Sequence, residues 1–170
     1  MDTFDAIMKR RSIRKYEHKP LKEGDLRKIL EAGRQAPSAA NRQPWHFVVV
    51  EDEEERRAVA EACSGQTWLA DAAVIIAGVG KPAVSDKWYA VDVAIAMENM
   101  ILAATALGYG SCWIGAFDQE QVKSLLGVPA DLAVVALTPV GWPADRPDPR
   151  PRQPMAEFVS AGRYGKSLPM

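Results

Sequence analysis

The segment from Trp88 to Leu107 constrains the fold more than any other part of this chain. It has the length of a helix and is apolar almost all round, with alanine at six of its positions. A helix that is apolar on every side must be covered on every side. The segment therefore predicts a central helix whose outer face is either buried inside one chain or covered by a second copy. Asp92, Glu98 and Asn99 interrupt its apolar surface, so we expect a buried helix and not a membrane span, which needs about 20 apolar residues.

The rest of the chain alternates helical and strand patterns without a regular βαβ rhythm. Apolar periodicity, capping residues and β-branched runs predict helices near 3–11, 26–33, 51–62 and 118–126, and strands near 45–50, 72–79, 111–116 and 132–140. Five prolines between 143 and 154 argue against regular structure there, so residues from about 142 to 170 should form an extended arm and tail. We predict one α+β domain over residues 1–170, with three layers and a mixed central sheet flanked by helices.

Composition excludes several classes of function. The net charge is −1, so no overall field attracts the chain to nucleic acid or to a membrane. Two cysteines far apart and only two histidines give no metal-ligand spacing, so we expect no metal site. No apolar stretch follows the first basic residues, and we therefore expect a cytoplasmic protein. Two Gly-x-Gly pairs lack the third glycine of a dinucleotide fingerprint, so we expect no Rossmann site, and a nicotinamide, if one is used, would visit as a substrate.

A cluster of arginines follows the first predicted helix. Arg10, Arg11 and Arg14 are spaced so that like charges share one helical face, and Ser12 adds a hydroxyl beside them. A phosphate placed between the guanidinium groups would neutralise them through bidentate hydrogen bonds. A solvated basic turn at the end of a helix, favoured by the helix dipole, would show the same pattern. The cluster alone leaves both interpretations open.

The predicted arm carries a second group of arginines. Arg150 and Arg152 flank a proline, and Arg146 lies close by in sequence. Because proline stiffens the chain, these side chains can be held at a fixed point at little entropic cost. The alternative is a linker whose charges are simply solvated. If the arm folds back on the body, the two groups of arginines would form a phosphate clamp.

Two further segments are suited to contacts with a planar heterocycle. Ser38, Asn41 and Gln43 lie between two prolines, and their amides can donate and accept hydrogen bonds at the edge of a pyrimidine. Gly115 follows Ile114 at the end of a predicted strand, where a glycine lets a ligand approach the backbone. Ordinary turns and a strand end would also account for these residues.

Together, these segments resemble the nitroreductase family of FMN enzymes. The resemblance covers most of the chain in family order and rests on four motifs, Arg10-Arg11-Ser12-Ile13-Arg14, Pro37-Ser38-x-x-Asn41-x-Gln43-Pro44-Trp45, Leu107-Gly108-Tyr109-Gly110-Ser111-Cys112-Trp113-Ile114-Gly115, and Pro139-Val140-Gly141 with Arg150-Pro-Arg152. It implies a homodimer with FMN at its interface and NAD(P)H as the reducing co-substrate. The implied activity is two-electron transfer to a small organic acceptor such as a nitroaromatic compound or a quinone.

The resemblance also implies a set of cofactor-binding residues: Arg10, Arg11, Ser12, Arg14, Pro37, Ser38, Ala39, Asn41, Gln43, Ile114, Gly115, Arg150 and Arg152. The arginines and Ser12 would hold the phosphate or the pyrimidine edge, the 37–43 loop would line the flavin, and the 114–115 backbone would approach N5. No catalytic side chain is expected, because the flavin carries the chemistry.

The chain is shorter than the better-known members of that family, so a lid over the flavin would have to come from residues 64–69 and 81–88. Trp68 and Trp88 in these segments would either cover the flavin and line the substrate pocket or pack in the core. The same scaffold could instead serve flavin fragmentation or reductive dehalogenation, which need an enclosing lid. A flavin-binding redox sensor with little turnover is the third alternative.

Overall fold

The computed structural model describes residues 1–169, and their helices and strands follow the predicted order closely. In chain order the elements are α1 (Thr3–Lys9), β1 (Tyr16–Glu17), α2 (Asp25–Arg34), the 3-10 turn η1 (Ala39–Asn41), β2 (Trp45–Val50), α3 (Glu53–Ala62), η2 (Thr67–Asp71), β3 (Val74–Gly80), α4 (Tyr89–Ala106), β4 (Gly110–Ser111), α5 (Gln119–Leu126), β5 (Ala133–Pro143) and α6 (Met155–Phe158). The aspartates at positions 2, 52 and 118 cap α1, α3 and α5 by accepting a hydrogen bond from a first-turn N–H.

The sheet has the order β1-β5-β3-β2, with β4 also paired to β5. The named strands pair antiparallel, and a single parallel bridge joins Ser12 to Ser111. All seven residues of β3 are buried, because helices cover both faces of the sheet there. Successive side chains of a strand point to opposite faces of the sheet, so β3 contributes to two separate cores. Ile75, Ala77 and Val79 join the core beneath α3 and α5, while Val74 and Ile76 join the core beneath α2 and α4.

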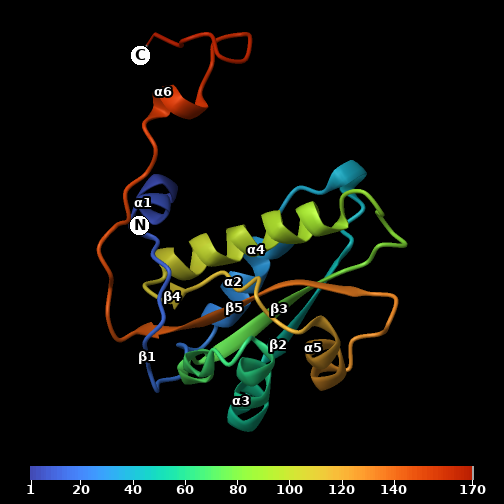
Figure 1. Cartoon of the computed structure of the whole chain (residues 1–170). Coiled ribbons are helices and arrows are strands. Elements are labelled where there is room, and N and C mark those ends of the chain that lie inside the picture. Colours follow the sequence, from blue (N-terminus) through green and yellow to red (C-terminus); the bar gives the residue numbers. More distant parts are fainter. Residues whose placement is uncertain (170) are drawn as a thin grey trace.

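Figure 1 shows the three layers, with α4 lying across one face of the sheet and α3 and α5 on the other. Close approach of α4 to β3 depends on Gly78. A Cβ atom at that position would lie 2.3 Å from Sδ of Met97 and 2.8 Å from Cγ1 of Val93. The predicted long central helix is confirmed, and its inner side is packed on the sheet as the sequence pattern indicates.

One side of α4 is not covered within the chain. Val91 and Ile95 on this side are 48% and 37% exposed, and Phe4, Ile7 and Met8 of α1 are exposed as well. By length and hydropathy α4 is also the one helix among residues 1–169 that would suit a membrane span. Its packing on the sheet makes it a core helix with one uncovered face.

The predicted strand at 111–116 is shorter than expected. Regular pairing with β5 ends at Ser111 and resumes only at Ile114, which exchanges two hydrogen bonds with Leu137 of 2.9 and 3.0 Å. The register is the same on both sides of the gap and sets Cys112 opposite Pro139. Proline has no N–H to donate, so the ladder is interrupted there.

The arm also departs from the prediction at two points. β5 extends through Trp142 and Pro143, which pair with β1, so the arm begins at residue 144 and not at about 142. The chain then passes beside α1 and leads away from the body (Figure 1). The four-residue helix α6 forms directly after Pro154. Proline is excluded from the interior of a helix but is well tolerated at its start. Proline density therefore predicted the irregular stretch before Pro154 but not the helix behind it.

Candidate functional site

The two groups of arginines line one cavity, although more than a hundred residues separate them in sequence. This cavity, termed here the arginine cavity, has a volume of about 480 Å³. Its lining is Ile7, Met8, Arg10, Arg11, Ser12, Arg14, Glu98, Leu102, Pro147, Asp148, Pro149, Arg150 and Arg152. The structure thus brings Arg10, Arg11 and Arg14 together with Arg150 and Arg152. Arg146, which is close to the second group in sequence, lies outside the cavity and donates to the carbonyl of Gly108 at 2.9 Å.

Local packing fixes the first group of arginines. Ile13 is buried, and its N–H donates to the carbonyl of Ser111 at 2.9 Å. Gly110 makes room for it, because a Cβ there would lie 2.6 Å from Ile13. Ser12 and Arg14, on either side of this anchor, therefore face the cavity.

The arginines differ in what they contact. Arg11 donates from Nη1 to the carbonyls of Met8 and Arg10, both at 2.8 Å, and so caps the end of α1. Arg14 lies over the ring of Trp68, 6.0 Å from its centroid. Within residues 1–169, the side chains of Arg10, Arg150 and Arg152 form no hydrogen bond or ion pair. The interpretation as a helix-end basic turn thus fits Arg11, while the others present free guanidinium groups.

The charge balance of the arginine cavity is strongly positive. Its five guanidinium groups face two carboxylates, Glu98 of α4 and Asp148 of the arm. Burial raises the pKa of Glu98 above its usual value, and the neighbouring Arg10 opposes that rise. Burial likewise raises the pKa of the Cys112 thiol, opposed by Arg14 and Ser12. Such a donor set fits a doubly charged phosphate monoester.

The 37–43 loop does not line the arginine cavity. Its shape comes from its own hydrogen bonds: the Ser38 hydroxyl accepts from the N–H of Gln43 at 3.0 Å, and Nε2 of Gln43 donates to the Asn41 carbonyl at 3.1 Å. Ala39 in this loop donates its N–H to Asp92, near the start of α4. Asp92 precedes Glu98 and Leu102 of the arginine cavity by six and ten residues, or about 9 and 15 Å along a helix. One chain therefore keeps these two parts of the predicted site apart.

The 114–115 backbone is open on one side. Gly115 is exposed, and a Cβ at this position would have only Nε1 of Trp113 within 4 Å, at 3.8 Å. Gln66 lies next to it, since its Nε2 donates to the carbonyls of Cys63 and Ala116. Nothing in the sequence singled out Gln66, because its place beside the glycine depends on how η2 packs.

The two tryptophans lie in different surroundings. Trp68 of η2 is half-buried against the core and beneath Arg14, and its neighbour Leu69 is fully buried. Trp88, just before α4, is half exposed. Each of the two segments considered for a lid has one buried residue, Leu69 in 64–69 and Ser85 in 81–88.

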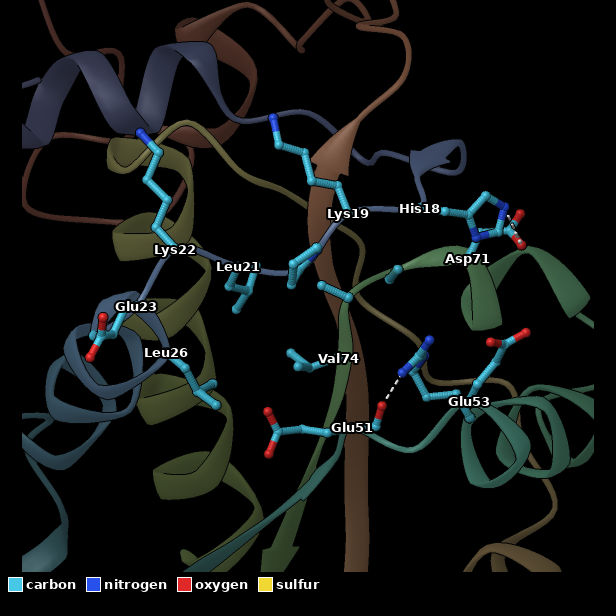
Figure 2. A pocket seen from close by; sticks show the side chains of 15 residues that line it. His18, Lys19, Leu21, Lys22, Glu23, Leu26, Glu51, Glu53, Asp71 and Val74 are labelled. Atoms are coloured by element: carbon cyan, nitrogen blue, oxygen red, sulfur yellow. Dashed lines mark hydrogen bonds and ion pairs between the residues drawn. The ribbon is translucent and has the colours of Figure 1, made fainter.

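A second cavity of about 530 Å³ lies at the end of the sheet, between the 18–26 segment and the start of α3 (Figure 2). Several of its charged side chains already have partners within the chain. Nε2 of His18 is 3.7 Å from a carboxylate oxygen of Asp71, and Arg56 donates to the carbonyls of Glu51 and Ala70. None of the residues singled out from the sequence lines this cavity. The arginine cavity is therefore the stronger candidate.

Comparison with known proteins places this arrangement in context. The model of the nitroreductase family matches residues 7–73 and 62–142. A relative from Archaeoglobus fulgidus is 39% identical over 86% of this chain and 88% of its own length. A protein of Bacillus subtilis named FMN reductase [NAD(P)H] is 29% identical, over 90% of this chain and 70% of its own length. The solved structure of a nitroreductase family protein from Clostridium novyi has 36% identity and a TM-score of 0.80, covering 99% of this chain and 97% of that one.

Proposed function

Because the chain belongs to the nitroreductase family, we propose that it is an FMN-dependent oxidoreductase that transfers two electrons from NAD(P)H to a small organic acceptor. Nitroaromatic compounds and quinones are the acceptor classes that we propose. The relative named for FMN and NAD(P)H supports this assignment. We also propose that the whole chain forms one FMN-binding unit that works in the cytoplasm.

The arginine cavity carries the proposal. Arg10 and Arg14 with Ser12 would hold the FMN phosphate from one side, and Arg150 and Arg152 from the arm would hold it from the other. Three of these guanidinium groups have no protein partner among residues 1–169, so binding would break no existing contact of theirs. Charge-assisted hydrogen bonds to phosphate are among the strongest that a protein surface can offer.

The flavin ring would extend toward the exposed backbone at Gly115. Ile114 is fixed by its two hydrogen bonds to Leu137, so the neighbouring backbone is held rigidly. The permanent positive charge of Arg14 would extend from the phosphate site toward the pyrimidine edge, where negative charge develops on reduction. FMN, when bound, supplies the two-electron chemistry, and the residues of the chain bind it, orient it and tune its charge.

We propose that the active form is a homodimer with FMN at the interface. The 37–43 loop is tied to α4 at Asp92, about 9 to 15 Å along the helix from Glu98 and Leu102 of the arginine cavity, and the equivalent loop of a second copy would complete each site. The uncovered face of α4, with Val91 and Ile95, and the exposed apolar residues of α1 form the surface that this copy would cover.

The direct test is the visible spectrum of the purified protein, with chromatography of the extracted cofactor. We expect a yellow protein that releases FMN and oxidises NADH or NADPH when a quinone or nitroaromatic acceptor is added. A colourless protein that takes up no added FMN would refute the proposal.

A further inference from the structure

Asp92 is a buried acid in the first turn of the otherwise apolar α4. Asp92 is only 3% exposed, and its two carboxylate oxygens lie 3.2 and 3.3 Å from the backbone nitrogen of Ala39, whose N–H donates to them. Burying a carboxylate is costly unless it is hydrogen-bonded. The sequence pattern marked Asp92 only as an interruption of an apolar helix, whereas the structure gives it a defined partner 53 residues earlier in the chain.

The partner lies in the most strained segment of the described chain. Ala40, Asn41 and Gln43 have φ values of 51°, 54° and 51°, in the left-handed region that non-glycine residues rarely adopt. Such conformations persist only where surrounding contacts hold them. The other hydrogen bonds of residues 38–43 stay within this segment. Gln43 donates to Ser38 and Asn41, and the N–H groups of Asn41 and Arg42 donate to the carbonyls of Ser38 and Ala39. Within residues 1–169, the Ala39–Asp92 contact is thus the hydrogen bond that ties the strained segment to another element.

We infer that Asp92 is a positioning residue that holds the 38–43 loop in the shape required to contact the flavin. The inference rests on the proposed function, in which Ser38 and Asn41 line the cofactor. Helix α4 carries Asp92 near its start and Glu98 and Leu102 of the arginine cavity farther along. In the proposed dimer the loop completes the site of the second copy, and Asp92 fixes it to α4, the helix whose uncovered face forms the proposed interface. Asp92 acts through Ala39 and does not touch the cofactor itself.

A purely structural role for Asp92 is the competing explanation. An acid in the first turn of a helix is stabilised by the helix dipole wherever its side chain points. In that case its loss would lower stability without altering the loop. Val93 provides a matched comparison, since it occupies the same turn, is fully buried, and packs toward Gly78 of the sheet. Val93→Ala weakens the same part of α4 but leaves the loop contact in place.

Two substitutions remove the contact from opposite sides. Asp92→Ala deletes the acceptor, and Ala39→Pro deletes the donor N–H. Proline fits position 39 because Ser38, with ψ of 156°, already has the extended conformation that precedes proline, and because Ala39 opens the η1 turn. Asp92→Asn keeps an oxygen that can accept from Ala39. If Asp92→Ala does not fold, Ala39→Pro carries the test alone.

The measurements are FMN binding by each apoprotein, the visible circular dichroism of the bound flavin, and the thermal midpoint of the apoprotein. We expect Asp92→Ala and Ala39→Pro each to weaken FMN binding by about tenfold more than Val93→Ala, with an altered flavin dichroism. The double variant should be no weaker than either single variant, because both remove the same hydrogen bond. Asp92→Asn should restore most of the affinity and the wild-type dichroism.

Affinities within about twofold of Val93→Ala for Asp92→Ala and Ala39→Pro would overturn the inference, since a tenfold loss corresponds to one hydrogen bond to a charged group. Additive effects in the double variant would overturn it as well. Failure of the wild-type protein to bind FMN would instead refute the proposed function. In that case the positioning role is read from the exchange rate of the Ala39 amide hydrogen, which Asp92→Ala should accelerate and Val93→Ala should not. Equal exchange rates in these two variants would overturn the inference independently of FMN.

Discussion

Arg10 and Arg11 are neighbours in sequence, yet the structure predicts opposite consequences for replacing them. Arg10 has no protein partner among the described residues and lines the arginine cavity, so Arg10→Ala should remove one charge-assisted contact to the FMN phosphate. Such a contact contributes about 1.5–3 kcal/mol, which corresponds to a roughly 10- to 100-fold increase in Kd. The stability of the apoprotein should be unchanged or slightly higher, because like-charge repulsion is relieved.

Arg11 also lines the arginine cavity, but its guanidinium is bound to two carbonyls at the end of α1. Its replacement by alanine should cost about 1 kcal/mol of stability, the net value of a typical hydrogen bond in a partly exposed setting. The thermal midpoint should fall by roughly 3 °C, and the Kd for FMN should rise by less than it does in Arg10→Ala.

Fluorescence titration of the apoproteins with FMN and thermal unfolding of the same samples would measure both effects. Lys15→Ala is the matched control, because Lys15 is an exposed cation nearby that pairs with Asp145 and does not line the arginine cavity. It should change neither quantity appreciably. If Arg11→Ala lost as much FMN affinity as Arg10→Ala while its thermal midpoint stayed constant, the assignment of the two side chains would be wrong.

Three other predictions follow from the packing and the surface. Gly78→Ala should cost about 1–3 kcal/mol, measured by urea unfolding, since the new methyl group would overlap Met97; full stability would contradict the described approach of α4. Ile95→Glu should shift the protein from dimer to monomer in sedimentation velocity, and an unchanged dimer would place the interface elsewhere. Burial raises the pKa of Cys63 to about 11, above its unfolded value near 9. The contribution of the protonated thiol to the free energy of unfolding is therefore fully present below pH 9 and is lost as pH rises toward 11. Urea midpoints should therefore fall more steeply over this interval in the wild-type protein than in Cys63→Ala. Parallel plots of midpoint against pH for the two proteins would rule out the thiol as the source of this pH dependence.

The sequence predicted those parts of the fold that depend on local pattern. The apolar length of α4, the aspartate caps and the β-branched runs of β2 and β3 each carry their signal within a few neighbouring residues. The shortened β4 could not be predicted in this way, because it results from Pro139, which lies on another strand. The helix α6 could not be predicted either, because its four residues are too few to show a helical periodicity.

The candidate site divides along similar lines. The arginine residues could be chosen from sequence because phosphate recognition needs clustered guanidinium groups. The selection could not distinguish Arg11, since its contacts with α1 depend on the turn that the backbone makes there. Asp92 was noted only as an exception in an apolar helix, because its partner Ala39 contributes a backbone N–H, which every residue except proline possesses.

The position of β5 has a consequence for the synthesis of the protein. This strand joins β1, β3 and β4, yet it is the last strand to be made. Before β5 has been made, β3 has only β2 as a partner, β4 has only its bridge to Ser12, and β1 has no partner strand. Closure of the sheet must bring residues 16 and 143 together, a separation that slows folding. The nascent chain therefore exposes apolar residues of α4 and β3 until β5 has been synthesised, an interval in which chaperones would be expected to bind it.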